Sequence, residues 1–271
     1  MSSTEISGFK VVIPSRFGST RFPGKVLAEI AGKPMLAHAY DRAVESGADE
    51  IQVAGDDSRI ADFCSSCNIP YVDTRPEHNN GTERIAEVVE KLDWSADTVI
   101  VGLQCDEPAT PPVILKQVAD NLLQQPAADI ATLCSVIDSA AVYHDPNRVK
   151  VVTDVNGYAL YFSRAPIPWR RDSVTDSGST NLANADENDS FPRAHVHIGM
   201  YAYRASFLKA YTSLAETRYE NEEKLEQLRA LGHGFKIHVD EANAPPSHGV
   251  DIKDDLAEAE RALLELLKAK R

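Results

Sequence analysis

This chain of 271 residues has few cysteines, no long apolar run and no excess of basic residues. No stretch approaches the roughly 18 consecutive apolar residues of a membrane-spanning helix, so a membrane protein is not expected. Residues 1–7 contain neither the basic nor the apolar part of a secretory signal, so we expect a cytoplasmic protein. The 4 cysteines are too few for a disulfide framework, which agrees with a reducing compartment.

Positive charge is scarce overall but concentrated near the N-terminus. The chain has 28 Lys and Arg residues against 41 Asp and Glu residues, a net charge of −13 that repels nucleic acid and anionic membranes. Between Phe9 and Pro34 the balance reverses, because the only acid there, Glu29, faces five bases: Lys10, Arg16, Arg21, Lys25 and Lys33. This basic stretch suits a small anionic ligand, although on charge alone a solvated surface is the simpler explanation.

Buried strand patterns alternate with amphipathic helix patterns in the first half of the chain. Strands are predicted at residues 11–13, 51–54, 71–72 and 98–103. Helices are predicted at residues 34–45, 58–67, 83–92 and 113–123, the third of them capped by Thr82. This order predicts an α/β fold, with a mainly parallel sheet and helices on both faces.

The second half has an antiparallel character. Residues 149–155 and 158–163 flank Asn156-Gly157, which is a strong two-residue hairpin signal. Another strand at 195–203, a helix at 222–231, a strand at 235–239 and a terminal helix at 251–267 follow. Residues 172–192 are rich in Ser, Asn and Asp and predict a mobile loop. We therefore predict one domain over residues 1–271, with an antiparallel subregion at 147–215.

The loop after the first strand, residues 14–25, is the first candidate site. Gly18 and Gly24 would let backbone N–H groups approach a phosphate, and Arg16, Arg21 and Lys25 would supply charge. The loop also follows the carboxyl end of a strand, where open parallel sheets bind ligands. It matches neither the Walker nor the dinucleotide-binding spacing, so by itself an ordinary surface turn remains the simpler reading.

Carboxylates at two further places in the chain are the second and third candidates. Asp106 and Glu107 follow the strand at 98–103, and Asp251 precedes the last predicted helix. Carboxylates at such a position suit Mg²⁺, which completes its coordination with phosphate and water. Taken singly, the pair at 106–107 fits a solvated turn, and Asp251 fits a helix N-cap.

Histidine and cysteine pairs give weaker signals. His195 and His197 share one face of a predicted strand, but a metal pair lacks a third ligand. Cys64 and Cys67 form an isolated CxxC on a predicted helix, which is weak evidence for zinc or redox chemistry.

Seven segments in order along nearly the whole chain carry a more specific signal. They are residues 11–25, Gly32-Lys-Pro-Met35, Gly81-Thr-Glu-Arg84, Gln104-Cys-Asp-Glu-Pro108, Tyr161-Phe-Ser-Arg164, Leu225-Glu-Gln-Leu-Arg229 and Gly249-Val-Asp251. Together they resemble the 3-deoxy-manno-octulosonate cytidylyltransferases, also called CMP-KDO synthetases. The resemblance implies a nucleotidyltransferase fold of Rossmann-like type.

The same resemblance implies a Mg²⁺-dependent transferase. It would move CMP from CTP to the anomeric hydroxyl of 3-deoxy-D-manno-octulosonate (KDO), release pyrophosphate, and supply lipopolysaccharide biosynthesis. It also implies a homodimer, with the antiparallel subregion near Tyr201 as the contact. The attacking hydroxyl, the α-phosphorus and the leaving oxygen must lie in line, so catalysis is mostly positioning and charge neutralisation.

Site residues are implied by matching position. Catalysis would rest on Lys25, Arg16 and Asp106, and Asp106 and Asp251 would hold Mg²⁺. Nucleotide contacts would come from Arg16, Ser19, Arg21, Lys25, Arg75, Gly81, Thr82 and Gln104. Sugar contacts would come from Arg164, His197, Tyr201, Glu226 and Gln227, where an arginine suits the sugar carboxylate.

Two alternatives stay open. The same chemistry could act on a related acidic sugar, such as 8-amino-KDO or a sialic acid, or the chain could be a non-catalytic nucleotide-binding module. The presence of both Asp106 and Asp251 disfavours the second alternative. Cys105 stands where the family usually has glycine, so we expect activity to be sensitive to thiol modification.

Overall fold

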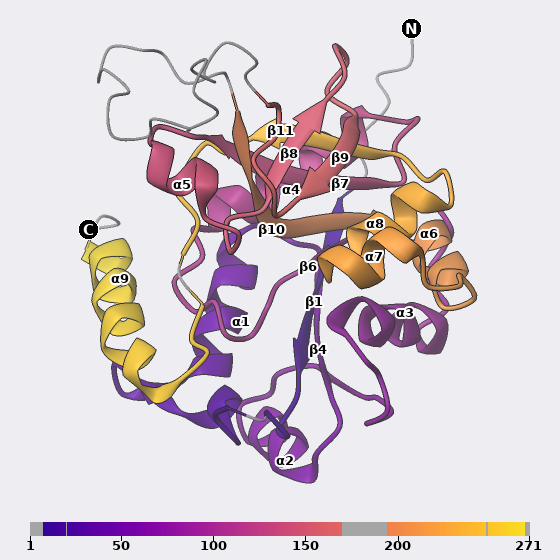
Figure 1. Ribbon diagram of the computed structural model, residues 1–271. Helices are drawn as coiled ribbons and strands as arrows, with labels where there is room; N and C mark the ends of the chain where they lie inside the picture. The colour runs from indigo at the N-terminus through magenta and orange to yellow at the C-terminus, as the bar shows by residue number, and fades with distance from the viewer. Residues whose placement is uncertain (1–7, 20, 170–193, 248, 269–271) are drawn as a thin grey trace, which may run out of the picture.

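A nine-stranded sheet forms the centre of the molecule (Figure 1). The computed structural model describes residues 8–19, 21–169, 194–247 and 249–268. The main path through the sheet is β11-β7-β10-β6-β1-β4-β5. Their bounds, in the same order, are Ile237–Glu241, Ile130–Val136, His195–Arg204, Val99–Gly102, Phe9–Ser15, Glu50–Gly55 and Tyr71–Asp73. Neighbours on this path are parallel except on both sides of β10, which confirms the mainly parallel prediction.

The central strands are buried on both faces, and alternate residues enter different cores. In β1, Val11 and Ile13 join one core and Val12 joins the other. In β6, Val99 and Val101 join the first core and Ile100 the second. Each such side chain stabilises the fold by about 2 kcal/mol relative to leaving it exposed. Continuous apolar runs are therefore what these strands require.

Helices cover both faces of the sheet, as the sequence predicts (Figure 1). The first core is closed by α1 (Met35–Glu45), α2 (Ser58–Ser66) and α4 (Pro112–Gln124). The second core is closed by α3 (Gly81–Lys91), α6 (Ala205–Tyr211) and α8 (Gln227–Gly232). No helix among the described residues is long and apolar enough to cross a membrane.

The antiparallel part is built around β10. The hairpin of β8 (Lys150–Thr153) and β9 (Ala159–Ser163) turns at Gly157, whose φ of 83° favours glycine. β8 pairs with the first residues of β10. Further along, the pairing of β10 with β7 shifts register between Ile198 and Tyr201. This irregularity lies beside the second cavity described below.

A third, smaller core seats the C-terminal part of the chain. Ala259 and Leu263 of α9 (Leu256–Lys268) belong to the same buried cluster as Met35 and Val250. The cluster also takes in Ile30, from the short hairpin of β2 (Glu29–Ile30) and β3 (Lys33–Pro34). Docking of α9 beside α1 thus carries the segment with Asp251 back to the sheet (Figure 1).

Several local predictions are wrong. The cap of α3 is Asn80, whose Oδ1 accepts the N–H of Glu83 at 2.8 Å, and not Thr82. The helix predicted at 222–231 is two helices, α7 (Arg218–Glu223) and α8, because Lys224 adopts φ 53° between them. The last helix begins at Leu256, after the 3-10 turn Lys253–Asp255. The loop predicted at 172–192 lies outside the described residues.

Replacing the cap of α3 tests how this helix is held. Asn80→Ala should lower the free energy of unfolding by about 1 kcal/mol, because an N–H of the first turn loses its acceptor. Urea unfolding measures this, and Asn80→Asp should retain most of the stability. Asn79→Ala is the matched control, since the contact of Asn79 with α3 comes from its backbone N–H, which the variant keeps. Equal losses from Asn79→Ala and Asn80→Ala would contradict the assignment of the cap.

Candidate active site

The loop after β1 forms one wall of a cavity of about 330 Å³. Arg16, Ser19, Arg21 and Lys25 line the cavity from this loop. On the other side it is lined by Gln104, Asp106 and Asp251. The structure therefore brings together the three candidate regions, which are far apart in the sequence. The combination of three cations and two carboxylates suits a phosphorylated ligand with an associated cation.

Lys25 occupies the centre of this cavity wall. Its Nζ lies 2.5 Å from Asp106 Oδ2, 2.9 Å from the carbonyl oxygen of Val250 and 3.6 Å from Asp251 Oδ1. Arg21 Nη2 lies 3.0 Å from the same oxygen of Asp251. Both carboxylates therefore converge on one ammonium group, at the edge where β1 and β6 end.

The position of Asp251 is set by backbone contacts. The N–H of Val250 donates to the carbonyl oxygen of Asp106 at 2.8 Å, and Val250 itself is buried. Asp255 Oδ2 accepts the N–H groups of Asp251 at 2.7 Å and Ile252 at 2.9 Å. The side chain that caps the N–H groups at this turn is therefore that of Asp255 and not that of Asp251.

Asp106 and Asp251 fit a divalent cation of the magnesium type. Their carboxylates are partly exposed, with 29% and 53% of the side chain accessible, and both reach the point occupied by the Lys25 ammonium. Among the described residues there is no group of three or more His, Cys, Asp or Glu side chains suited to a metal. Two carboxylates with the remaining positions left to phosphate and water is the usual protein contribution to a Mg²⁺ site.

A second cavity of about 230 Å³ adjoins the first through a shared residue, Gln104. It is lined by Tyr201, Tyr203 and Tyr211 on one side and by Thr82, Lys224, Glu226 and Gln227 on the other. Thr82 Oγ1 lies 3.3 Å from Glu226 Oε2 and 3.5 Å from the Tyr203 hydroxyl oxygen. Aromatic faces with a few polar groups are typical of a pocket for a small polar organic molecule.

Burial adjusts the ionisation of several groups in and near the two cavities. It raises the pKa of Tyr201 and Tyr203, so their hydroxyls remain protonated at neutral pH. Desolvation also raises the pKa of Glu226, although Thr82 and Arg229 oppose this effect. Next to Asp106 but outside the lining of the first cavity, Glu107 has its pKa raised to about 7 by burial and by the Asp106 charge.

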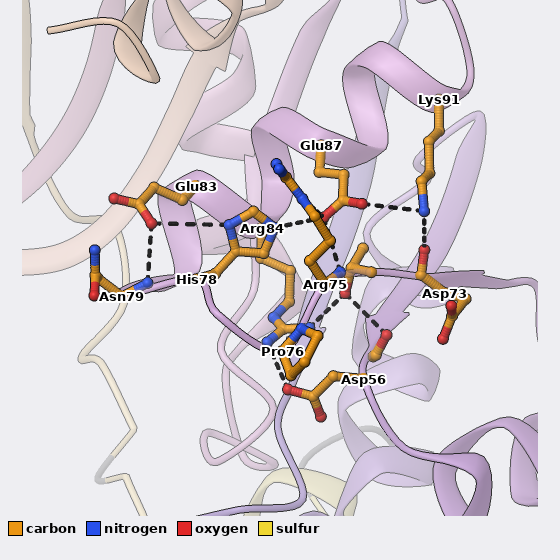
Figure 2. Close-up of polar contacts among 12 residues, drawn as sticks. Asp56, Asp73, Arg75, Pro76, His78, Asn79, Glu83, Arg84, Glu87 and Lys91 are labelled. Carbon is orange, nitrogen blue, oxygen red and sulfur yellow. Dashed lines mark hydrogen bonds and ion pairs between the residues drawn. The ribbon is translucent and has the colours of Figure 1, made fainter.

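Three of the predicted site residues do not line either cavity. Arg75 lies among the polar contacts on the outer side of α3, with Nε 3.5 Å from Glu87 Oε2 (Figure 2). Arg164 donates through Nε to the Glu223 carbonyl oxygen at 2.7 Å and through Nη1 to that of Pro146 at 3.0 Å. His197 lies behind Tyr201, where burial lowers its pKa to about 3 and keeps it neutral.

Lys224, Tyr203 and Tyr211 are cavity residues that the sequence analysis does not predict. Lys224 is the only cation among the described residues that line the second cavity, and it takes its place there through the left-handed turn between α7 and α8. The two tyrosines follow Tyr201 in an array of aromatic rings that includes Phe207. Tyr203 could have been predicted, because it lies two residues after Tyr201 in β10 and therefore on the same face of the strand.

Cys105 is buried, whereas the sequence analysis expects a thiol that reagents can modify. Only 3% of the residue is exposed, and burial raises the pKa of its thiol to about 12. A protonated, enclosed thiol is a poor nucleophile, so the expectation that activity responds to modification at Cys105 has no support in the structure.

Comparison with known proteins agrees with this geometry. The sequence profile of the family described as Cytidylyltransferase matches residues 10–237. The 3-deoxy-manno-octulosonate cytidylyltransferase of Pseudomonas syringae pv. syringae is 46% identical over 257 residues, which are 95% of this chain and 98% of the relative. The enzyme of the same name from Idiomarina loihiensis is 48% identical, covering 93% and 97%.

Solved structures show the same relationship. CMP:2-keto-3-deoxy-manno-octonic acid synthetase, in complex with CTP, superposes with a TM-score of 0.83 at 37% identity, covering 96% of this chain and 99% of that one. A nucleotidyl transferase from Methanothermobacter shares the fold alone, with a TM-score of 0.59 at 14% identity.

The fold, the paired cavities and the family profile define this protein as a nucleotidyltransferase. Within that class, the chain belongs to the cytidylyltransferase family, with the 3-deoxy-manno-octulosonate cytidylyltransferases as its relatives over nearly their full length.

Thiol labelling tests the placement of the cysteines. Cys67 is exposed, whereas Cys64, Cys105 and Cys134 are buried. Iodoacetamide should therefore modify Cys67 rapidly in the native protein and the other three only after unfolding, as peptide mass spectrometry would show. Rapid native labelling of Cys105, with loss of activity that Cys105→Gly prevents, would restore the expectation drawn from the sequence.

Proposed function

We propose that this protein transfers CMP from CTP to the anomeric hydroxyl of 3-deoxy-manno-octulosonate, with release of pyrophosphate. The observation that carries the proposal is the pair of adjoining cavities that share Gln104. The charged cavity suits a triphosphate and the tyrosine-lined cavity suits a sugar, so the two substrates would meet beside Gln104. Family membership and the names of the relatives support the same pairing of substrates.

The triphosphate would bind along the loop after β1. Arg16, Arg21 and Lys25 would neutralise its charge, and Ser19 would add a hydrogen bond. Gly81 and Thr82, at the start of α3, line the second cavity next to Gln104, so they would face the ribose and base where the nucleotide extends past that shared residue.

The sugar would occupy the second cavity. Tyr201, Glu226 and Gln227 offer hydrogen-bonding groups for its hydroxyls, and Lys224 offers a charge for its carboxylate. Arg164, which the family resemblance assigns to the carboxylate, would first have to release the carbonyls of Glu223 and Pro146. His197 would act from behind, by fixing the ring of Tyr201, which lies 5.3 Å away between centroids.

Lys25, Asp106 and Asp251 would organise the reacting phosphate. The two carboxylates would hold Mg²⁺, which supplies charge screening at the phosphates. Lys25 is held by Asp106 and by the Val250 carbonyl, so its ammonium is already oriented toward the cavity before substrate binds. Such preorganised charge lowers the barrier to phosphoryl transfer more than a mobile side chain would.

The biological setting is part of the same proposal. Transfer to KDO would place the enzyme in the cytoplasm as a supplier of activated sugar for lipopolysaccharide. The antiparallel subregion at 147–215 would form the contact of a homodimer. The exposed apolar side chains of Val155 and Leu160 in the β8–β9 hairpin support this assignment.

Pyrophosphate release tests the substrate assignment. With CTP and Mg²⁺ present, KDO should give turnover and a sialic acid should give none. The rate with 8-amino-KDO relative to that with KDO measures the selectivity for the sugar. ATP, GTP and UTP in place of CTP are the matched nucleotide controls. Bound CTP without turnover on any of the three sugars would identify a binding module instead of an enzyme.

Removing either carboxylate tests the metal assignment. Asp106→Asn and Asp251→Asn should each lower kcat by about a hundredfold or more, because the charge that organises the phosphates is lost. Mg²⁺ should also stop raising the melting temperature of these variants in the presence of CTP. Asp120→Asn, on the exposed side of α4, is the control and should behave as the wild type. Near-normal turnover at saturating Mg²⁺ would remove the altered residue from this role.

A further inference from the structure

A polar network ties the segment of residues 74–80 to helix α3 (Figure 2). Glu87, which is 6% exposed, accepts hydrogen bonds from the His78 ring and from the backbone N–H of Arg75, the latter at 3.0 Å. One turn earlier on the same helix, Glu83 accepts the N–H of Asn79 at 2.9 Å. Two carboxylates of one helix therefore hold the segment at several points.

A second layer of contacts fixes the start of the segment. Arg84 is fully buried and donates to Asp56 Oδ2 at 2.7 Å and to the Thr74 hydroxyl. That hydroxyl donates to the carbonyl oxygen of Gly55 at 2.9 Å. The segment is thus anchored to the end of β4 at one end and to the middle of α3 at the other.

The segment in turn holds Arg16. Arg16 Nη2 donates to the carbonyl oxygen of His78 and lies 3.5 Å from that of Pro76. Among the described residues these neutral oxygens are the partners of the Arg16 side chain, whereas Arg21 and Lys25 each face a carboxylate. Carbonyls orient a guanidinium without cancelling its charge, so Arg16 keeps its full attraction for an anion.

We propose that Glu87 and His78 are positioning residues that aim Arg16 at the triphosphate of CTP by holding the Pro76 and His78 carbonyls in place. The inference rests on the proposed function, in which Arg16 binds the triphosphate. Neither Glu87 nor His78 lines the nucleotide cavity, so both act through Arg16.

The ionisation of Glu87 agrees with this arrangement. Burial by itself would raise the pKa of Glu87, but the hydrogen bonds from His78, the Arg75 N–H and Lys91 outweigh it and lower the pKa to about 2. The carboxylate is therefore charged throughout the working range and accepts from every partner. A glutamine of the same size can keep one oxygen toward His78 and the Arg75 N–H only by turning its NH₂ toward Lys91, and it lacks the negative charge that strengthens all three contacts.

Steady-state kinetics of the full chain with CTP and KDO test the proposal. Glu87→Gln and His78→Ala should each raise KM for CTP by roughly three- to tenfold, the effect of a weakened charge-assisted contact. KM for the sugar and kcat at saturation should stay within about twofold, since ground-state CTP binding is what changes. Glu90→Gln is the matched control, because Glu90 is an exposed carboxylate of the same helix outside this network and should leave every constant unchanged.

A double-variant cycle separates this inference from the proposed function. Arg16→Ala should raise KM for CTP by about tenfold or more, and adding Glu87→Gln should cause no further loss. Full additivity, or a lowered melting temperature with an unchanged KM for CTP, would overturn the positioning role. An unchanged KM in Arg16→Ala itself would overturn the proposed contact to the triphosphate. If Glu87→Gln does not fold, His78→Ala carries the same cycle.

Discussion

One ammonium group, that of Lys25, joins the parts of the molecule that make up the nucleotide cavity. Its partners lie 81 residues away at Asp106 and 225 residues away at Val250, so the contact exists only when β1, β6 and the C-terminal segment are all in place. The buried cluster of Met35, Val250 and Leu263 supplies the apolar support for that arrangement. The Lys25 side chain is only 13% exposed, and its carboxylate and carbonyl partners offset the hydration that its ammonium group loses.

The sheet decides where the two cavities meet. Parallel strands β1 and β6 end at the same edge, which places the basic loop opposite Asp106. The antiparallel strand β10 crosses beside β6 and carries Tyr201 and Tyr203 to the adjoining space. Gln104, directly after β6, consequently borders both cavities. The antiparallel strand in this mixed sheet therefore places an aromatic cavity wall next to the basic loop that follows β1.

The two cavities differ in the charge and the burial of the side chains that line them. Charges in the first are partly exposed and held by short contacts, and they leave room for an ionic ligand. In the second, buried tyrosines keep their protons and offer neutral hydrogen bonds, while Glu226 is partly desolvated. Around them, the buried side chains of Arg84 and Glu87 form hydrogen bonds to specific partners and thereby fix the position of the neighbouring backbone.

Much of the fold could be predicted from the sequence, because hydrophobic periodicity is a local property. The runs at β1 and β6, the helical spacing of α1 and α4, and the turn at Gly157 each predict an element that the structure contains. The break at Lys224 could not be predicted in this way. It is stabilised by the buried pair of Glu220 and Arg229, whose atoms lie 2.6 Å apart and belong to different helices. Ion pairs between elements leave no periodic trace in the sequence.

By itself, the sequence determined the class of fold, the family resemblance and the residue types available at the two cavities. Only the tertiary structure decided which of them face a cavity: Lys224 and Tyr211 do, whereas Arg75 and Arg164 are engaged with other partners. It also decided that Cys105 is enclosed and that the carbonyl oxygens of Pro76 and His78 hold Arg16. The physical reason is that burial, ionisation and orientation depend on neighbours from distant segments, which a side chain acquires only when the chain is folded.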